Sequence, residues 1–344
     1  MKAEFNKDYT LKVLQDILAV DSPSGFTKNV VEKLVGYVKE IGFPYEITNK
    51  GNLIVSIFGE SDKTVGLAAH VDTLGLIVRG LKSDGTLSFM KIGGAILGTL
   101  DGEYCNIYTR CGKCYTGTIL SNSPAGHVFM DAHTIARDED TMHIRLDEKV
   151  KSKEDVLKLG INSGDFICYE PKTQITESGF IKSRFLDDKL SVAILIGAMK
   201  YIKDAGVKIK HNLKVIFPCY EEVGHGMSYM PDDISEIIAV DMGCIGLDLN
   251  CTEYDVSICA KDTSGPYDYE LVTRLAGLAK DNGLNYAVDI YPRYGSDVSA
   301  ALRAGYDIKG CVIGPGVAAS HGMERTHIES VENTFKLILL YLTA

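Results

Sequence analysis

Acidic side chains and histidines stand at the ends of the apolar runs in this sequence. The run at residues 64–69 leads into a His-x-Asp triplet, the run at 213–217 into a Glu-Glu pair, and the run at 237–240 into a single Asp. A fourth run, 309–313, precedes a Gly-Pro-Gly segment and then a histidine, and an Asp-Asp pair stands just before a helical pattern. The residues concerned are His70, Asp72, Asp187, Asp188, Glu221, Glu222, Asp241 and His321.

These residue types form a mixed nitrogen and oxygen donor set that contains no cysteine. Imidazole together with carboxylate suits Zn²⁺, Co²⁺ or Mn²⁺ better than Ca²⁺ or Mg²⁺. So many like charges near one point would repel one another without a cation. Five or six donors also exceed the four of a closed structural zinc site, so the set predicts two metals that share a bridging carboxylate.

Each of these motifs is weak evidence when taken alone. A His-x-Asp triplet at a strand end is usually a structural hydrogen-bonded pair. Neighbouring side chains of a strand point to opposite faces, so Glu221 and Glu222 can serve one site only if the chain turns there, and Gly224 and Gly226 permit such a turn. The combination of motifs in this order is what favours a metal site.

The elements that would position these residues alternate between strand and helix. Helical periodicity covers residues 11–18, 26–41, 190–205, 269–282, 298–304 and 331–342, and β-type runs cover 52–58, 64–69, 213–217, 237–240, 286–290 and 309–313. This alternation predicts an α/β fold, with a mostly parallel open sheet and helices on both faces. Ligands bind at the carboxyl ends of the strands in such sheets, where the residues above would converge.

The residue pattern changes in the middle of the chain. From about residue 75 to 179, short β-type runs alternate with Gly, Asn, Asp and Ser turns, and only residues 153–159 look helical. We therefore expect a discontinuous catalytic domain at residues 1–73 and 180–344, interrupted by a β-rich insertion at 74–179. Within the insertion, Cys111-Gly-Lys-Cys114 lacks a second cysteine pair, so we expect two buried thiols near a turn.

Composition and charge exclude several kinds of partner. The 344 residues include 36 Lys and Arg against 46 Asp and Glu, a net charge of −10 without a basic stripe, so nucleic acid is not expected to bind. The longest apolar runs are far shorter than the ~20 residues of a membrane helix. Nine scattered cysteines and the lack of a signal-peptide pattern favour reduced thiols and a cytoplasmic protein.

Five segments together resemble a known family over nearly the whole chain. They read AAHVDTLG, SRFLDDKLS, FPCYEEVGHG, AVDMG and SHGMERTH. In combination they resemble the tetrahedral (TET) aminopeptidases, a family of co-catalytic dinuclear metallopeptidases that includes glutamyl and deblocking aminopeptidases and members mislabelled as endoglucanases. The resemblance implies a zinc-exopeptidase-like fold, hydrolysis of N-terminal residues from peptides, and a β-rich dimerisation domain. It also implies assembly of dimers into a dodecamer.

The resemblance also implies a role for each matching residue. Asp187 would bridge two divalent metals, most simply Zn²⁺, with Co²⁺ or Mn²⁺ as alternatives. His70 and Asp241 would complete one site, and Glu222 and His321 the other. Glu221 would be the general base for the attacking water held by the metals, and Asp72 would orient His70.

The sequence departs from the family pattern at two loops. Thr73 stands where the family often has Glu, and His225-Gly226-Met227 stands where it often has Leu-Arg-Gly. The metal donors survive both changes, so the departures bear on the substrate pocket. Asp297, in a Gly-Ser-Asp segment that resembles a Gly-Thr-Asp loop of the family, is expected to be a helix N-cap.

Other functions fit parts of the same pattern. A metal-dependent deacylase or carboxypeptidase would use the same centre, the latter with an arginine for the substrate carboxylate, for which the candidates are Arg184, Arg293 and Arg325. A glycosidase could use Glu221 and Glu222 as its carboxylate pair, but it would leave the histidines without a role. A non-catalytic homologue would keep the fold without turnover.

Overall fold

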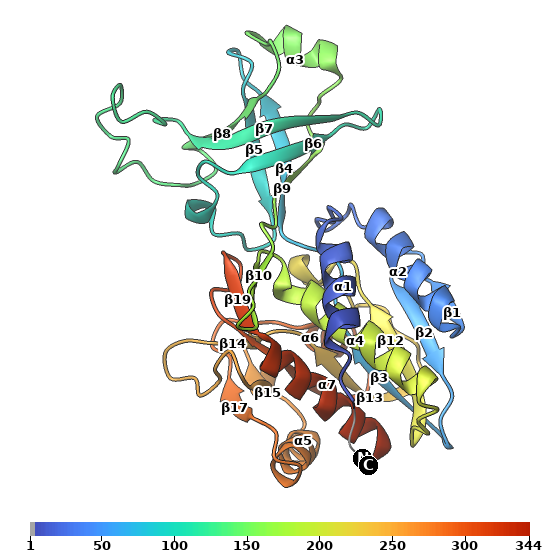
Figure 1. Ribbon diagram of the computed structural model, residues 1–344. Coiled ribbons are helices and arrows are strands. Elements are labelled where there is room, and N and C mark those ends of the chain that lie inside the picture. Colours follow the sequence, from blue (N-terminus) through green and yellow to red (C-terminus); the bar gives the residue numbers. More distant parts are fainter. Residues whose placement is uncertain (1–3) are drawn as a thin grey trace. The chain divides into compact units, whose positions relative to one another are not determined.

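A computed structural model describes residues 4–344, which form two compact units. One unit contains the residues up to Asp72 together with Lys172–Ala344, and the other is Thr73–Pro171 (Figure 1). The sequence had led us to expect the second boundary at residue 179. Residues 172–179 belong with the first unit because β10 (Gln174–Ile175) pairs with β11 (Phe180–Ser183), which in turn pairs with β19 (Glu324–His327).

The first unit contains a large mixed sheet. Its strands lie in the order β1-β2-β12-β3-β13-β18-β15-β16, with β17 beside β15 and β14 beside β18. The central neighbours β12, β3, β13 and β18 are parallel, so their carboxyl ends share one edge. The strands are β1 (Tyr45–Ile47), β2 (Leu53–Ile57), β3 (Ser61–Ala68), β12 (His211–Phe217), β13 (Ile234–Val240), β14 (Gly243–Cys244), β15 (Val256–Asp262), β16 (Gly265–Pro266), β17 (Tyr286–Ile290) and β18 (Lys309–Val317).

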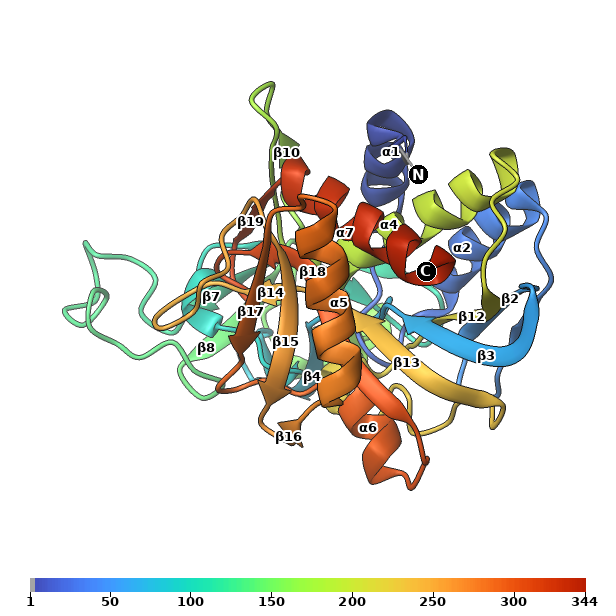
Figure 2. The ribbon, with the colours of Figure 1, turned by 90° about the horizontal axis from the view of Figure 1, so that it is seen from below.

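Helices cover both faces of this sheet. Helices α1, α2, α4 and α7 pack against one another on one side, and α6 lies on the other (Figure 2). The α6 side holds a buried cluster that includes Met227, Ile237, Tyr291 and Val298. The helices are α1 (Lys7–Leu18), α2 (Lys28–Ile41), α4 (Leu186–Asp204), α5 (Tyr269–Asp281), α6 (Asp297–Arg303) and α7 (Ile328–Thr343). The predicted α/β class, with a mostly parallel core, is confirmed.

The strand β18 continues further than the sequence indicated. We expected it to end at Ile313, before a Gly-Pro-Gly loop, but it runs through Gly314 and Gly316 to Val317. The reason is close packing: a Cβ on Gly314 would lie 1.4 Å from the carbonyl oxygen of Asp241 on the neighbouring chain segment. Glycine therefore allows β18 to approach the segment that carries Asp241, which fixes the position of that residue.

The second unit is built on a closed barrel. Its strands lie in the order β4-β5-β8-β7-β6-β9. They are β4 (Gly75–Leu81), β5 (Leu87–Ile92), β6 (Tyr104–Tyr108), β7 (Cys114–Ser121), β8 (Met142–Leu146) and β9 (Phe166–Tyr169), with the helix α3 (Lys153–Leu159) and the 3₁₀ turn η1 (Leu97–Thr99) between strands. The β-rich character predicted for this region is thus present.

All nine cysteines are free thiols. The expectation that Cys111 and Cys114 are buried is wrong, because both thiols are exposed. Cys111 lies in the loop between β6 and β7, and Cys114 is the first residue of β7. In the described part of the chain, no helix has the length and apolarity that a membrane crossing requires.

Candidate metal centre

The predicted donors gather at one edge of the large sheet. His70 follows β3, the Glu pair follows β12, Asp241 follows β13 directly, and His321 follows β18. These four strands are neighbours, so their ends bring together residues that are far apart in sequence. Asp187 joins them from the first turn of α4, where Asp187 and Asp188 depart from helical geometry.

Asp187 lies between the two histidines. Its Oδ1 is 3.1 Å from Nε2 of His70, and its Oδ2 is 3.5 Å from Nε2 of His321. The same His321 nitrogen is 3.5 Å from Oε2 of Glu222. One carboxylate therefore faces an imidazole on each side, which is the arrangement expected of a bridging ligand.

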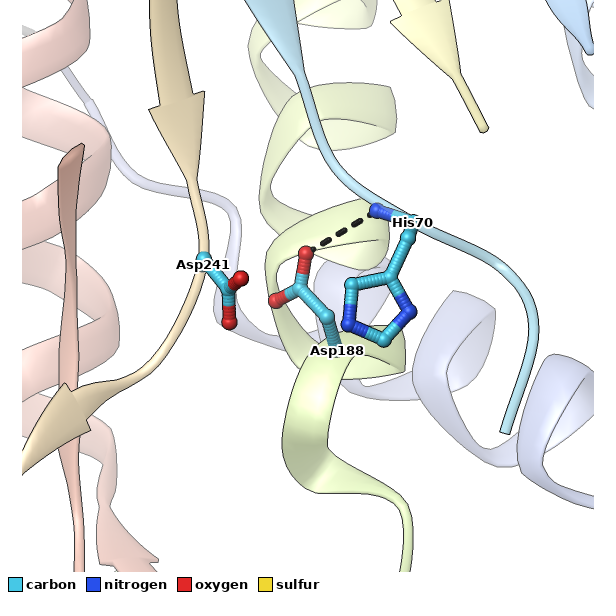
Figure 3. A group of neighbouring side chains, drawn as sticks. All are labelled: His70, Asp188 and Asp241. Carbon is cyan, nitrogen blue, oxygen red and sulfur yellow. Dashed lines mark hydrogen bonds between the residues drawn. The ribbon is translucent and has the colours of Figure 1, made fainter. Parts of the chain in front are cut away.

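Asp241 and Asp188 form a second group with His70. Donor atoms of these three residues, which Figure 3 shows, all lie within 4.8 Å of one another. Those of His70, Asp187 and Glu222 also lie within 4.8 Å of one another. The backbone N–H of His70 donates to Oδ2 of Asp188 at 3.1 Å. No role was predicted for Asp188, although its place beside Asp187 in the Asp-Asp pair is a signal that could have indicated one.

The Glu pair turns as the sequence required. Residues Glu221–Val223 form a 3₁₀ turn, η2, so both glutamates can face the same site. The turn is held by Asp72: the backbone N–H of Glu221 donates to its Oδ1 at 3.1 Å and that of Glu222 to its Oδ2 at 3.2 Å. The hydroxyl of Ser24 also donates to this carboxylate.

Asp72 contacts His70 mainly through its backbone. The ring nitrogen Nδ1 of His70 is 2.9 Å from the carbonyl oxygen of Asp72 and 3.5 Å from its Oδ1. This contact leaves Nε2 of His70 directed at Asp187 and Glu221, which lie 3.1 and 3.6 Å away. Asp72 therefore holds the glutamate turn with its side chain and the imidazole chiefly with its main chain.

Glu324 is a buried carboxylate that the sequence analysis missed. Its Oε2 accepts the backbone N–H groups of Leu186 (2.6 Å) and Asp187 (3.2 Å), and its Oε1 accepts that of His321 (3.1 Å). It therefore holds the loops that carry Asp187 and His321. Burial, and then the charge of Asp187, raise the pKa of Glu324 to about 8.

Asp297 does not act as the expected helix N-cap. Ser296 caps α6, with its side chain accepting the N–H of Ser299, whereas Asp297 accepts the backbone N–H of Met227 at 2.9 Å. The expectation was wrong because the serine before Asp297 takes the capping position. Asp297 holds the segment after the Glu pair, and a Cβ on Gly226 would lie 2.3 Å from its Oδ1.

The electrostatics of the cluster are those of crowded buried acids. Burial is the first cause that raises the pKa of Glu221, Glu222 and Asp188 well above the ordinary range, and neighbouring carboxylates add to it. The pKa of Asp241 rises to about 6 for the same reasons. Burial disfavours the charged forms of both His70 and Asp187. Contacts with Asp187 and Asp72 nevertheless raise the pKa of His70. Contacts with His321 and His70 lower the pKa of Asp187.

These residues fit a bound divalent cation. Two buried carboxylate oxygens at the cluster, Oε1 of Glu222 and Oδ1 of Asp188, have no hydrogen-bond partner among residues 4–344. Buried acceptors of this kind are costly unless a donor or a cation satisfies them. A dication would also remove the repulsion that raises the pKa values of the acids around it.

Comparison with known proteins agrees with this geometry. A model of the M42 glutamyl aminopeptidase family matches residues 51–337. The chain is 43% identical over 335 residues to YhfE of Bacillus subtilis (strain 168), to which aminopeptidase activity is ascribed, and the match covers 97% of each chain.

Two solved structures have a similar fold. PhTET1-12s, described as a dodecamer in the asymmetric unit, has a TM-score of 0.84 at 25% identity, covering 97% of this chain and 98% of that one. The Pyrococcus horikoshii TET1 peptidase, which can assemble into a tetrahedron or a large octahedral shell, has a TM-score of 0.84 at 24% identity, covering 97% and 99%.

The fold, the clustered donors and these similarities define a peptide hydrolase of the aminopeptidase class. The chain belongs to the M42 glutamyl aminopeptidase family. The resemblance to TET aminopeptidases seen in the sequence is thereby confirmed.

We expect Asp72→Asn to weaken Zn²⁺ binding about 10- to 100-fold, as for other supporting partners of metal ligands. The carboxylate accepts hydrogen bonds from the backbone N–H groups of Glu221 and Glu222. In the variant, an amide nitrogen would face one of these N–H groups and could not accept its hydrogen bond, which would loosen the glutamate turn. Calorimetric titration of Zn²⁺ into metal-stripped protein measures the effect. Asp140→Asn, at an exposed ion pair with Arg79, is the matched control, and equal affinities in the two variants would contradict the role given to Asp72.

Proposed function

We propose that this chain is a dinuclear metal-dependent aminopeptidase in which Asp187 bridges the two cations. The observation that carries the proposal is the position of the Asp187 carboxylate between His70 and His321, with one oxygen toward each. His70 and Asp241 would complete one site, and Glu222 and His321 the other. Asp188, anchored by the N–H of His70, would be a further acidic neighbour of the first site.

The donor set indicates which metals to test. Imidazole and carboxylate without thiolate favour Zn²⁺, with Co²⁺ and Mn²⁺ as alternatives. When bound, two such cations would lower the pKa of a water molecule toward neutrality and neutralise negative charge on the substrate carbonyl oxygen.

Glu221 is the general base in this proposal. Its Oε2 lies 3.6 Å from Nε2 of His70, at the centre of the donor cluster, and its backbone is fixed by Asp72. Its carboxylate would take a proton from the attacking water and deliver it to the leaving amine. Glu222, the next residue, contacts His321 instead, so the two adjacent glutamates have different roles.

The carboxypeptidase alternative is less well supported. Of the arginines that could hold a substrate carboxylate, Arg325 is already paired with Glu253 through Nε (2.6 Å) and Nη2 (2.9 Å) and lies over the ring of Phe180. Arg293 is exposed. Family membership favours the amino-terminal specificity, and the nine free thiols suit a reducing compartment such as the cytoplasm.

We expect Glu221→Gln to lower turnover of aminoacyl-nitroanilides by about 10³-fold, within the range for loss of a general base. Zinc content should not change, because the proposed ligands are intact. Elemental analysis of the purified variant measures zinc, and steady-state kinetics measure turnover. Glu332→Gln on the surface of α7 is the control, and a Glu221→Gln enzyme with near-normal rates would refute the base assignment.

The chain is also proposed to form dimers through the Thr73–Pro171 unit and, from these, a dodecamer. The similar PhTET1-12s is a dodecamer, and the Thr73–Pro171 unit exposes large apolar side chains, among them Val128 and Met130. Such exposed apolar groups are typical of protein interfaces.

Light scattering tests the assembly. The wild-type protein should have a mass near that of twelve 37.6-kDa chains, and the Met130→Glu variant should have a smaller mass. A monomeric wild-type protein would contradict the assembly.

A further inference from the structure

The loop between β17 and α6 carries a tyrosine that the proposed mechanism does not use. The backbone of Tyr294 is fixed at both polar groups, since its N–H donates to Oγ1 of Thr263 and its carbonyl accepts the N–H of Thr263, both at 3.0 Å. Its ring packs edge-on against Tyr291, with the ring centroids 5.1 Å apart and an interplanar angle of 80°. The side chain is therefore held in one place.

The hydroxyl of Tyr294 is buried and has no hydrogen-bond partner within residues 4–344. A buried hydroxyl without a partner destabilises the folded protein, so this one requires an explanation. The contrast with its neighbour is direct: the buried hydroxyl of Tyr291 donates to Oγ of Ser257 at 2.6 Å.

The surroundings of this hydroxyl are the metal centre. Burial, and then the negative charges of Asp241, Asp187 and Glu221, raise the pKa of Tyr294 well above its ordinary value. The Asp241 carboxylate is a close neighbour of the Tyr294 hydroxyl, but the two do not form a hydrogen bond in the structure. A tyrosine hydroxyl is an O–H donor at neutral pH, and this one lies beside the cluster without a partner of its own among the described residues.

We propose that Tyr294 is a further catalytic residue, whose hydroxyl donates a hydrogen bond to the substrate carbonyl oxygen as negative charge develops there. The inference rests on the proposed function. The other side chains of the centre are carboxylates and imidazoles that act as ligands or base, so a neutral, fixed and unpaired donor is suited to this task. Donors held ready for an oxyanion stabilise the transition state more than the substrate.

Tyr294→Phe tests the proposal, with Tyr291→Phe as a matched control that removes a paired hydroxyl next to it. We expect Tyr294→Phe to lower kcat on the order of 10²-fold with little change in KM. A tetrahedral aminoalkylphosphonate, with the side chain of the best nitroanilide substrate, should bind more weakly by a similar factor. Binding of the corresponding free amino acid should not change.

Two measurements on metal-free protein separate this role from a structural one. The midpoint of thermal unfolding should stay equal or rise for Tyr294→Phe and fall for Tyr291→Phe, because only the latter loses a hydrogen bond. Zn²⁺ affinity should match the wild type. Unchanged kcat and phosphonate binding, or a loss of Zn²⁺ affinity that parallels the loss of activity, would overturn the inference. An active Glu221→Gln enzyme would instead overturn the proposed function.

Discussion

The structure depends on the crowding of buried carboxylates at one edge of a parallel sheet. Strands β12, β3, β13 and β18 end side by side, and acidic residues or histidines follow each of them. Burial and mutual repulsion raise the pKa values of Glu221, Glu222, Asp188 and Asp241, so these groups cannot all carry a charge there without a counter-ion. In the proposed function, divalent cations would resolve this conflict, and the proposed chemistry uses the same charges.

A second layer of acids holds the first in place. Asp72, Glu324 and Asp297 each accept backbone N–H groups from loops that carry or adjoin proposed ligands. This use of carboxylates as acceptors of main-chain hydrogen bonds fixes the loops with few side chains. It also makes the surroundings still more acidic. This acidity strengthens the case for bound cations, and it sets a neutral donor such as Tyr294 apart from its neighbours.

Much of this was accessible from the sequence because periodicity and strand-end chemistry are local signals. The alternation of helix and strand, the convergence of His70, Asp241 and Glu222, and the turn at the Glu pair follow from them. Glu324 and the true role of Asp297 were not accessible, because their partners are main-chain groups distant in sequence. The continuation of β18 through Gly314 depends on close contact with Asp241, which no local pattern encodes.

The central claim is that two cations share the Asp187 carboxylate, and metal stoichiometry tests it most directly. Metal-stripped wild-type protein titrated with Zn²⁺ in a calorimeter should bind two equivalents per chain. Asp187→Asn should lose high-affinity binding at both sites, because the bridging oxygen serves each of them. A wild-type stoichiometry of one, or an Asp187→Asn variant that still binds two Zn²⁺ ions tightly, would contradict the account.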